Sequence, residues 1–206
     1  MKKIVCIHAH QSNIDYLDRM LESFPCTVQH EVIQLTEGNS DDSAVLKKKI
    51  LRFLSQETVA CFLTCTVHCG LIKEKALQGV PILKIEDPII ETLSSDPNDK
   101  VLLFTNPATV DLTMSKVQER ISRKQSNQNY EVEVIPDIFD LISKNKKNLY
   151  RTALLESIKT KTKTVYLMQL SMSLITDEYL PNGSKIINPY IEAKREYTKT
   201  IFGLLS

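Results

Sequence analysis

The sequence predicts an α/β protein made of two similar halves, each a small parallel sheet flanked by helices. Short apolar runs rich in Val and Ile alternate with segments of helical period along the whole chain of 206 residues, a pattern typical of strand–helix units. The polar, proline-containing stretch at 94–100 indicates a connection, and the same alternation starts again after it. Two pairs of segments also match at a spacing of about one hundred residues, which supports an internal duplication.

Four strands are predicted in the first half, at 4–7, 28–35, 58–64 and 81–85. Ser12 is placed to cap the first helix. The inner face of that helix recurs at three- and four-residue spacing, at Ile14, Leu17, Leu21 and Phe24. Asp41 and Asp42 open the second helix, because carboxylates stabilise a helix N-terminus. The Asp87-Pro88 pair starts the helix after the fourth strand.

The second half repeats this order, with strands at 100–104, 130–135, 164–168 and 185–187. Thr109 is predicted to cap a long helix that ends at Arg123. The region 137–162 is predicted to be helical, and a final helix begins at Pro189. The chain therefore contains two successive arrays of strands and helices.

The duplication is visible in local matches between the two arrays. KIEDPIIE at 84–91 lines up with KIINPYIE at 185–192, and KIVCIHAHQS near the start lines up with KVLLFTNPAT. Overlaying FLTCTVH on YLMQLSM places Gln169 opposite Cys65. The two positions are therefore expected to be equivalent in the two halves.

Composition excludes several classes of partner. The 26 Lys and Arg residues nearly balance 25 Asp and Glu residues, so the charge predicts neither a nucleic-acid nor a membrane partner. The first residues, MKKIVCIHAHQSN, have too short an apolar run for a signal peptide, and no run approaches transmembrane length. Five cysteines, an odd number, without an export signal favour reduced thiols and a cytoplasmic location. A homodimer is left open.

Ligands of open parallel sheets bind at the carboxyl ends of the strands, beside helix N-termini that carry unsatisfied N–H groups. The first half contributes five residues there: His8, Ala9, His10, Cys65 and Thr66. The second half contributes Thr105, Asn106, Thr109, Gln169 and Ser171. If the two halves face each other, one small anion meets a thiol on one side and an amide on the other.

The cysteine-rich segment 59–72, VACFLTCTVHCGLI, needs separate treatment. Cys61 inside the strand and Cys69 one helical turn past it are interpreted as core residues. Cys65 lies at the strand-to-helix junction, where a helix N-terminus lowers a thiol pKa and raises its reactivity. His68 is expected to cap the helix, to face solvent, or to donate a proton.

A zinc site is the alternative interpretation of the same segment. Cys65, His68 and Cys69 are acceptable ligands, and His8 or His10 could complete the set. No CxxC pair and no second local cluster accompany them. We therefore expect a reactive thiol and no metal.

Four segments in order resemble the aspartate/glutamate/hydantoin racemase superfamily. LTCTV at 63–67 and VPILKIEDPIIE at 80–91 resemble the thiol at the end of the third strand and the start of the next helix. FTNPAT at 104–109 and YLMQLSMSLI at 166–175 resemble motifs of the second half. The similarity extends over nearly the whole chain.

The resemblance implies two Rossmann-like halves related by a pseudo-two-fold axis, with the last helix packed on the first half. The first half would comprise 1–97 together with the helix 189–206, and the second 98–188. The resemblance also implies cofactor-free removal of a proton next to a carboxylate. Thr and Asn donors and helix N-termini would stabilise the negative charge that develops. In the family, two cysteines act on opposite faces of the reacting carbon.

This chain departs from that pattern at the second thiol. Gln169 occupies the equivalent place and Ser171 lies nearby, but neither side chain exchanges protons readily near neutral pH. His8 or His10 could replace the missing partner or activate Cys65. We therefore interpret the protein as a cofactor-independent isomerase or lyase that acts on a small carboxylic acid or amino acid, with Cys65 as acid/base or nucleophile. The alternative is an inactive protein of the same descent that binds a small anion.

Overall fold

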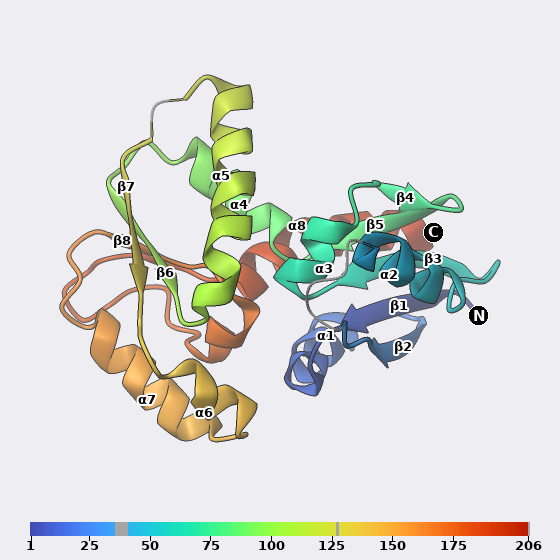
Figure 1. Cartoon of the computed structure of the whole chain (residues 1–206), viewed down its shortest axis with the longest axis horizontal. Helices are drawn as coiled ribbons and strands as arrows, with labels where there is room; N and C mark the ends of the chain where they lie inside the picture. The colour runs from blue at the N-terminus through green and yellow to red at the C-terminus, as the bar shows by residue number, and fades with distance from the viewer. Residues whose placement is uncertain (36–40, 127, 206) are drawn as a thin grey trace. The chain divides into compact units, whose positions relative to one another are not determined.

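The computed structural model describes residues 1–35, 41–126 and 128–205. The chain folds into two compact units, drawn in Figure 1: unit 1 is Met1–Ile85 with Lys194–Ser206, and unit 2 is Glu86–Ala193. The boundaries at 97 and 189 remain sequence predictions. By packing, the helix α4 (Asp87–Ser95) groups with unit 2.

Unit 1 contains a five-stranded sheet in the order β2-β1-β3-β5-β4. Its strands are β1 (Lys3–His8), β2 (Thr27–Val32), β3 (Thr58–Leu63), β4 (Ala76–Leu77) and β5 (Val80–Lys84). The first four strands in spatial order run parallel, whereas β4 pairs antiparallel with β5. The turn between them uses Gln78 and Gly79, both at positive φ (49° and 80°), where glycine carries no steric cost. The sequence patterns did not predict β4, which has only two residues.

The helices of unit 1 are η1 (Gln11–Asn13), α1 (Ile14–Leu21), α2 (Asp42–Leu51), α3 (Thr66–Leu71) and most of α8 (Pro189–Leu205). The prediction that Ser12 caps the first helix is wrong. Ser12 lies inside η1, and its backbone N–H donates to Nδ1 of the preceding cap residue His10 at 3.2 Å. Residue 206 of the predicted final helix lies outside the described residues.

The C-terminal helix α8 is attached to unit 1 by Tyr197. Its hydroxyl donates to the Lys84 carbonyl at 2.7 Å, and its ring meets Phe62 edge-on with centroids 5.5 Å apart. Figure 1 shows the chain end beside the strands of this unit. Within the described ranges, no helix has both the length and the apolar character that crossing a bilayer requires.

Unit 2 contains a four-stranded, fully parallel sheet in the order β7-β6-β8-β9. Its strands are β6 (Lys100–Phe104), β7 (Tyr130–Val134), β8 (Thr164–Leu167) and β9 (Ile186–Ile187). Besides α4, its helices are η2 (Pro107–Thr109), α5 (Val110–Lys124), α6 (Phe139–Ser143), α7 (Lys147–Ile158) and η3 (Leu170–Leu174). The predicted helical region 137–162 is therefore two helices, separated at Asn145, which adopts a left-handed φ of 56°.

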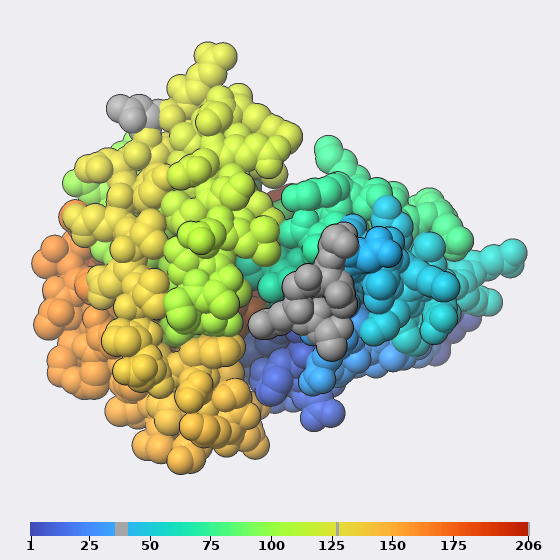
Figure 2. Space-filling model, viewed as in Figure 1, coloured from blue at the N-terminus to red at the C-terminus, as the bar shows by residue number. Residues whose placement is uncertain are grey.

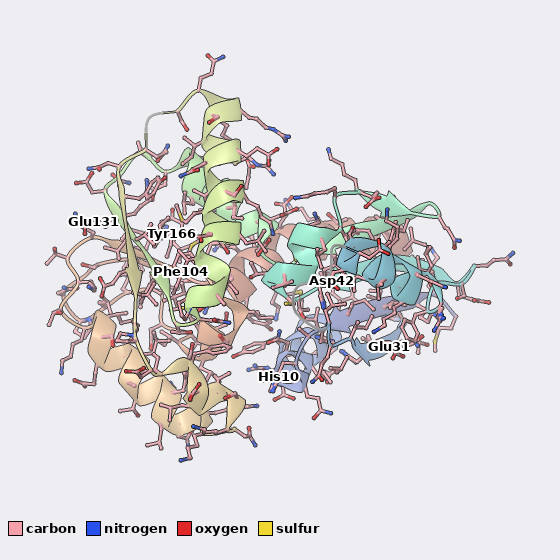
Figure 3. The ribbon with its side chains drawn as sticks, in the orientation of Figure 1. His10, Glu31, Asp42, Phe104, Glu131 and Tyr166 are labelled. Atoms are coloured by element: carbon pink, nitrogen blue, oxygen red, sulfur yellow. The ribbon has the colours of Figure 1, made fainter. Side chains whose placement is uncertain are left out.

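Apolar side chains cover both faces of the unit 2 sheet. Phe104 and Tyr166, labelled in Figure 3, lie on the face that packs against α4 and α5. Tyr150 and Leu154 of α7 pack against the opposite face. In unit 1 a cluster of buried residues lies between the sheet and the helices α2 and α3. Figure 2 shows the outer side of α2 on the surface, where Val45 is exposed.

The two sheets have the same topology. Strands β2-β1-β3-β5 of unit 1 correspond in order to β7-β6-β8-β9 of unit 2. The predicted α/β fold with two parallel-sheet halves is confirmed. The ends of β3 and β8 are equivalent positions, and they carry Cys65 and Gln169 respectively.

Candidate functional site

Cys65 is the cap residue between β3 and α3, with an extended backbone (φ −105°, ψ 132°) and a partly exposed side chain. It lines an open pocket of about 430 Å³ within unit 1. The pocket residues follow the ends of β1, β2 and β3 or belong to the starts of α2 and α3: Ala9, Gln34, Leu35, Asp42, Cys65, Val67 and His68. The pocket therefore lies at the carboxyl end of a parallel sheet, where ligands of such sheets bind.

The described lining combines a thiol, an imidazole and a carboxylate, and it includes no Lys or Arg. Asp42, labelled in Figure 3, opens α2 and brings the carboxylate. Val67 and Leu35 give the pocket apolar walls. Such a pocket suits a small, partly apolar molecule with hydrogen-bonding groups.

His68 is buried rather than facing solvent, with 1% of its surface exposed. Burial lowers its pKa to about 4, opposed by a hydrogen bond to the backbone of Ile33. Its Nδ1 has no hydrogen-bond partner among the described residues. The ring is therefore neutral near pH 7 and forms part of the pocket wall as a weak base.

His8, the last residue of β1, and His10, two residues further on, lie in different environments. His8 is fully buried, and its ring nitrogens meet Thr64 Oγ1 and His30 Nδ1, each at 2.9 Å. Burial, reinforced by His30 and His68, lowers the pKa of His8 to about 3. His10 is exposed and its ring caps η1 through the bond to Ser12. Neither ring is among the residues lining the pocket.

In unit 2 the predicted site residues are brought together around one amide. Gln169 Oε1 accepts from the backbone N–H of Thr105 (2.7 Å), from its hydroxyl (2.9 Å) and from the Asn106 N–H (3.0 Å). Gln169 Nε2 donates to the Thr109 hydroxyl at 2.8 Å. Gln169 is 8% exposed. Its oxygen therefore occupies a nest of donors that would suit a carboxylate oxygen.

Tyr150 extends this cluster. Because the Thr105 hydroxyl already donates to Gln169, it accepts from the Tyr150 hydroxyl at 2.9 Å. Ser171 Oγ lies 3.5 Å from the same Tyr150 oxygen. Burial raises the pKa of Tyr150, so its hydroxyl stays protonated and acts as a donor.

The structure thus assembles Thr105, Asn106, Thr109 and Gln169, and it places Cys65 in a pocket of the other unit with Thr66 as the next residue. Sequence reasoning missed the partners Thr64, His30, Asp42 and Tyr150. Thr64 directly precedes Cys65, but its contact with His8 spans 56 residues. His30, Asp42 and Tyr150 come from other strands and helices, so no local spacing pointed to these contacts.

Cys61 and Cys69 are buried in the core and are not accessible to a ligand. This burial is as predicted, and it raises the pKa of Cys61 to about 12. Within residues 1–35, 41–126 and 128–205, no group of three or more His, Cys, Asp or Glu side chains gathers in a way that could hold a metal ion.

Comparison with known proteins gives matches in structure alone. No protein-family model matches the chain, and no curated protein matches its sequence. Several solved structures match over nearly the full chain. The aspartate racemase of Picrophilus torridus has a TM-score of 0.69 at 14% identity, covering 97% of this chain and 94% of that one.

Two glutamate racemases are similar in the same way. The enzyme of Francisella tularensis, in complex with D-glutamate, has a TM-score of 0.66 at 15% identity, covering 100% of this chain and 83% of that one. The enzyme of Thermus thermophilus, in complex with beta-chloro-D-alanine, has a TM-score of 0.64 at 14% identity, with coverage of 100% and 83%. The resemblance predicted from the sequence is confirmed at the level of the fold: the chain has the two-unit α/β fold of the aspartate and glutamate racemases.

Proposed function

We propose that this protein is a racemase-like enzyme that moves a proton at the α-carbon of a small amino acid or carboxylic acid by means of the Cys65 thiol, without a cofactor. The observation that supports the proposal most directly is the position of Cys65, partly exposed in an open pocket at the end of β3. The substrates named for similar structures, aspartate and glutamate, define the class to be tested.

The proposed step transfers one proton and breaks no other bond. The Cys65 thiolate removes the α-proton, the electron pair stays on the substrate as a carbanion or enolate, and the thiol returns the proton. Neighbouring donors, including Thr66, would stabilise the developing charge. His68 is neutral near pH 7, so it adds no positive charge to the pocket.

A single thiol restricts the outcome. Gln169 cannot carry a proton at neutral pH, and both ring nitrogens of His8 are engaged with Thr64 and His30. We therefore expect exchange of the α-proton with solvent to be faster than inversion of configuration. Thr105, Asn106 and Thr109 would bind a substrate carboxylate only if it replaced the Gln169 amide, with Ser171 beside them.

Incubation in deuterium oxide with each enantiomer of aspartate and glutamate tests the proposal. Loss of the α-proton signal in the NMR spectrum should follow time and enzyme concentration. Cys65→Ala should slow this loss by about 100-fold or more, because a positioned acid/base contributes at least that factor. Cys26→Ala, which removes the other partly exposed thiol, should leave it unchanged. Equal exchange by the Cys65→Ala variant would exclude this thiol as the proton carrier.

The second candidate function is binding of a small carboxylate without turnover. The bonding of Gln169 favours it, because the amide saturates the donors that could otherwise hold a reacting group. A thermal-shift screen of the same amino acids separates the two. An amino acid that raises the melting temperature but shows no α-proton exchange supports the binding protein.

A further inference from the structure

A chain of hydrogen bonds runs through unit 1 from the surface to the end of β3. Asp18 Oδ1 of α1 lies 2.9 Å from His30 Nε2 of β2, and the Asp18 side chain is 58% exposed. His30 Nδ1 lies 2.9 Å from His8 Nε2, and His8 Nδ1 lies 2.9 Å from Thr64 Oγ1. We name these four side chains the relay. Exposure falls along it, from the surface carboxylate to the fully buried His8.

Counting donors fixes where the protons are when both imidazoles are neutral. Ionised Asp18 only accepts, so His30 must carry its proton on Nε2 and leave Nδ1 as an acceptor. His8 then donates from Nε2 to His30. His8 Nδ1 is left as an acceptor, and the Thr64 hydroxyl donates to it. Each polar atom of the relay is satisfied in this state.

One added proton on His30 gives a second, fully satisfied arrangement. Both nitrogens of His30 then donate, so His8 must accept at Nε2 and carry its own proton on Nδ1. His8 then donates to Thr64 Oγ1. The Thr64 hydroxyl turns to the Ile7 carbonyl, which lies 3.2 Å away. The two states differ by one proton taken from solvent, while His8 loses a proton at Nε2 and gains one at Nδ1.

The surroundings keep the added proton on His30. The two rings stack with centroids 5.1 Å apart, and burial lowers the pKa of His8 to about 3, so His8 stays neutral. Among the described residues, Asp18 of α1 pairs with His30, Cys6 of β1 lies beside His30 in the strand register, and His68 of α3 acts electrostatically on His8. Burial raises the pKa of Cys6 and lowers that of His68, so neither group carries a charge near pH 7.

We propose that the relay is a proton-dependent switch in which protonation of His30 reverses the tautomer of His8 and turns the Thr64 hydroxyl away from it. His8 and Thr64 directly precede Ala9 and Cys65, which both line the pocket. Protonation of His30 would therefore change the hydrogen bonds of His8 and Thr64, at the two strand ends beside the pocket. The switch does not require turnover, so it would operate in an enzyme and in a binding protein alike.

Nitrogen-15 NMR of the histidine rings in the full chain tests the switch. Over a titration from weakly alkaline to weakly acidic pH, His8 should change from the Nε2–H to the Nδ1–H form. The midpoint of this change should coincide with the midpoint of His30 protonation. A His8 ring that keeps one tautomer while His30 titrates would overturn the proposal, whether or not the protein shows activity.

Two variants separate the switch from a purely structural bond. Asp18→Asn replaces the carboxylate that lies 2.9 Å from His30 Nε2, so any shift of the His30 midpoint should appear equally in the His8 midpoint. A shift of the His30 midpoint without an equal shift for His8 contradicts the coupling. His30→Gln should make the His8 tautomer independent of pH. The matched control His10→Gln, on an exposed ring, should change neither midpoint.

Discussion

Equivalent positions in the two sheets differ in their exposure and in their hydrogen bonds. Cys65 follows β3 and Gln169 follows β8, and both have an extended backbone at the start of a short helix. Cys65 is partly exposed in a pocket, whereas Gln169 is buried and its amide is bonded on both sides. Two sheets of the same topology place these side chains at equivalent strand ends, and the neighbours of each side chain determine whether a ligand can reach it.

The neighbours differ at the ends of β1 and β6. His8 of unit 1 directs its hydrogen bonds to Thr64 and to His30, away from the pocket lining. Its counterpart in the repeat, Thr105, directs its N–H and its hydroxyl to Gln169. In the part of the chain that the structure describes, the hydrogen-bonded side chains His8, His30 and Thr64 of unit 1 are outside the pocket lining, whereas the donors of unit 2 converge on Gln169.

Acid should produce the largest difference between the units, because all four histidines lie in unit 1. The pKa values of His8 and His68 fall from 6.5 in the unfolded chain to about 3 and about 4. Below the unfolded value the unfolded chain binds protons that the folded chain excludes. The contribution of these rings to the free energy of unfolding is therefore fully present above the unfolded pKa and is lost as the pH falls toward the folded pKa values. Near pH 4 the loss is at most about 3 kcal/mol for each ring.

Urea unfolding near neutral pH and near pH 4 measures this loss. His68→Leu removes one buried ring and should reduce the acid-induced loss by up to about 3 kcal/mol, the contribution of that ring. His10→Gln, at an exposed ring, serves as the control and should leave the loss unchanged. An acid-induced loss that His68→Leu does not reduce would contradict the assignment to buried neutral rings.

Removal of the amide should have the next largest effect. Gln169→Ala leaves the Thr105 and Asn106 donors without their acceptor and should lower the free energy of unfolding by roughly 2 to 4 kcal/mol. Cys65→Ala, at the equivalent position, should cost less than about 1 kcal/mol because that side chain is partly exposed. Gln169→Glu keeps an acceptor oxygen and should recover about half of the alanine loss. Equal costs at Gln169 and Cys65 would remove the contrast between the units.

Tyr150→Phe should have a smaller effect on the same cluster. The substitution removes the hydroxyl that donates to Thr105 and keeps the buried ring. We expect the free energy of unfolding to fall by about 1 kcal/mol, the net value of one hydrogen bond. A stability equal to that of the unmodified protein in urea unfolding would show that the cluster ends at Gln169.

Alkylation should distinguish the units with little change in stability. Iodoacetamide should label Cys65 and Cys26 in the folded protein, and the buried Cys6, Cys61 and Cys69 only after unfolding. Gln169→Cys places a thiol at the equivalent buried position of unit 2. That thiol should react about 10-fold more slowly than Cys65, measured by peptide mass spectrometry. Faster labelling at position 169 would show that unit 2 also opens to small molecules.

Local signals predicted most elements because they depend on neighbouring residues alone. The strand at 100–104 is found as predicted, Thr109 precedes α5, and Pro189 begins α8. The two-residue β4 was missed because it has no periodicity of its own and forms only by pairing with β5. Ser12 was assigned the wrong role because the short turn η1 precedes α1, and within it Ser12 donates to His10.

The sequence by itself determined the α/β class, the repeated order of strands and the placement of Cys65 and Gln169 after equivalent strands. The tertiary structure alone decided which polar groups meet. His8 reaches Thr64 across 56 residues, and Gln169 reaches the Thr105 N–H across 64. Such partners come together only once strand order and register are set, and a shift of one residue would turn each side chain to the other face of its sheet. For this reason the residue types indicated the candidate chemistry. The open pocket at Cys65 and the donors occupied by Gln169 could be recognised only in the folded chain.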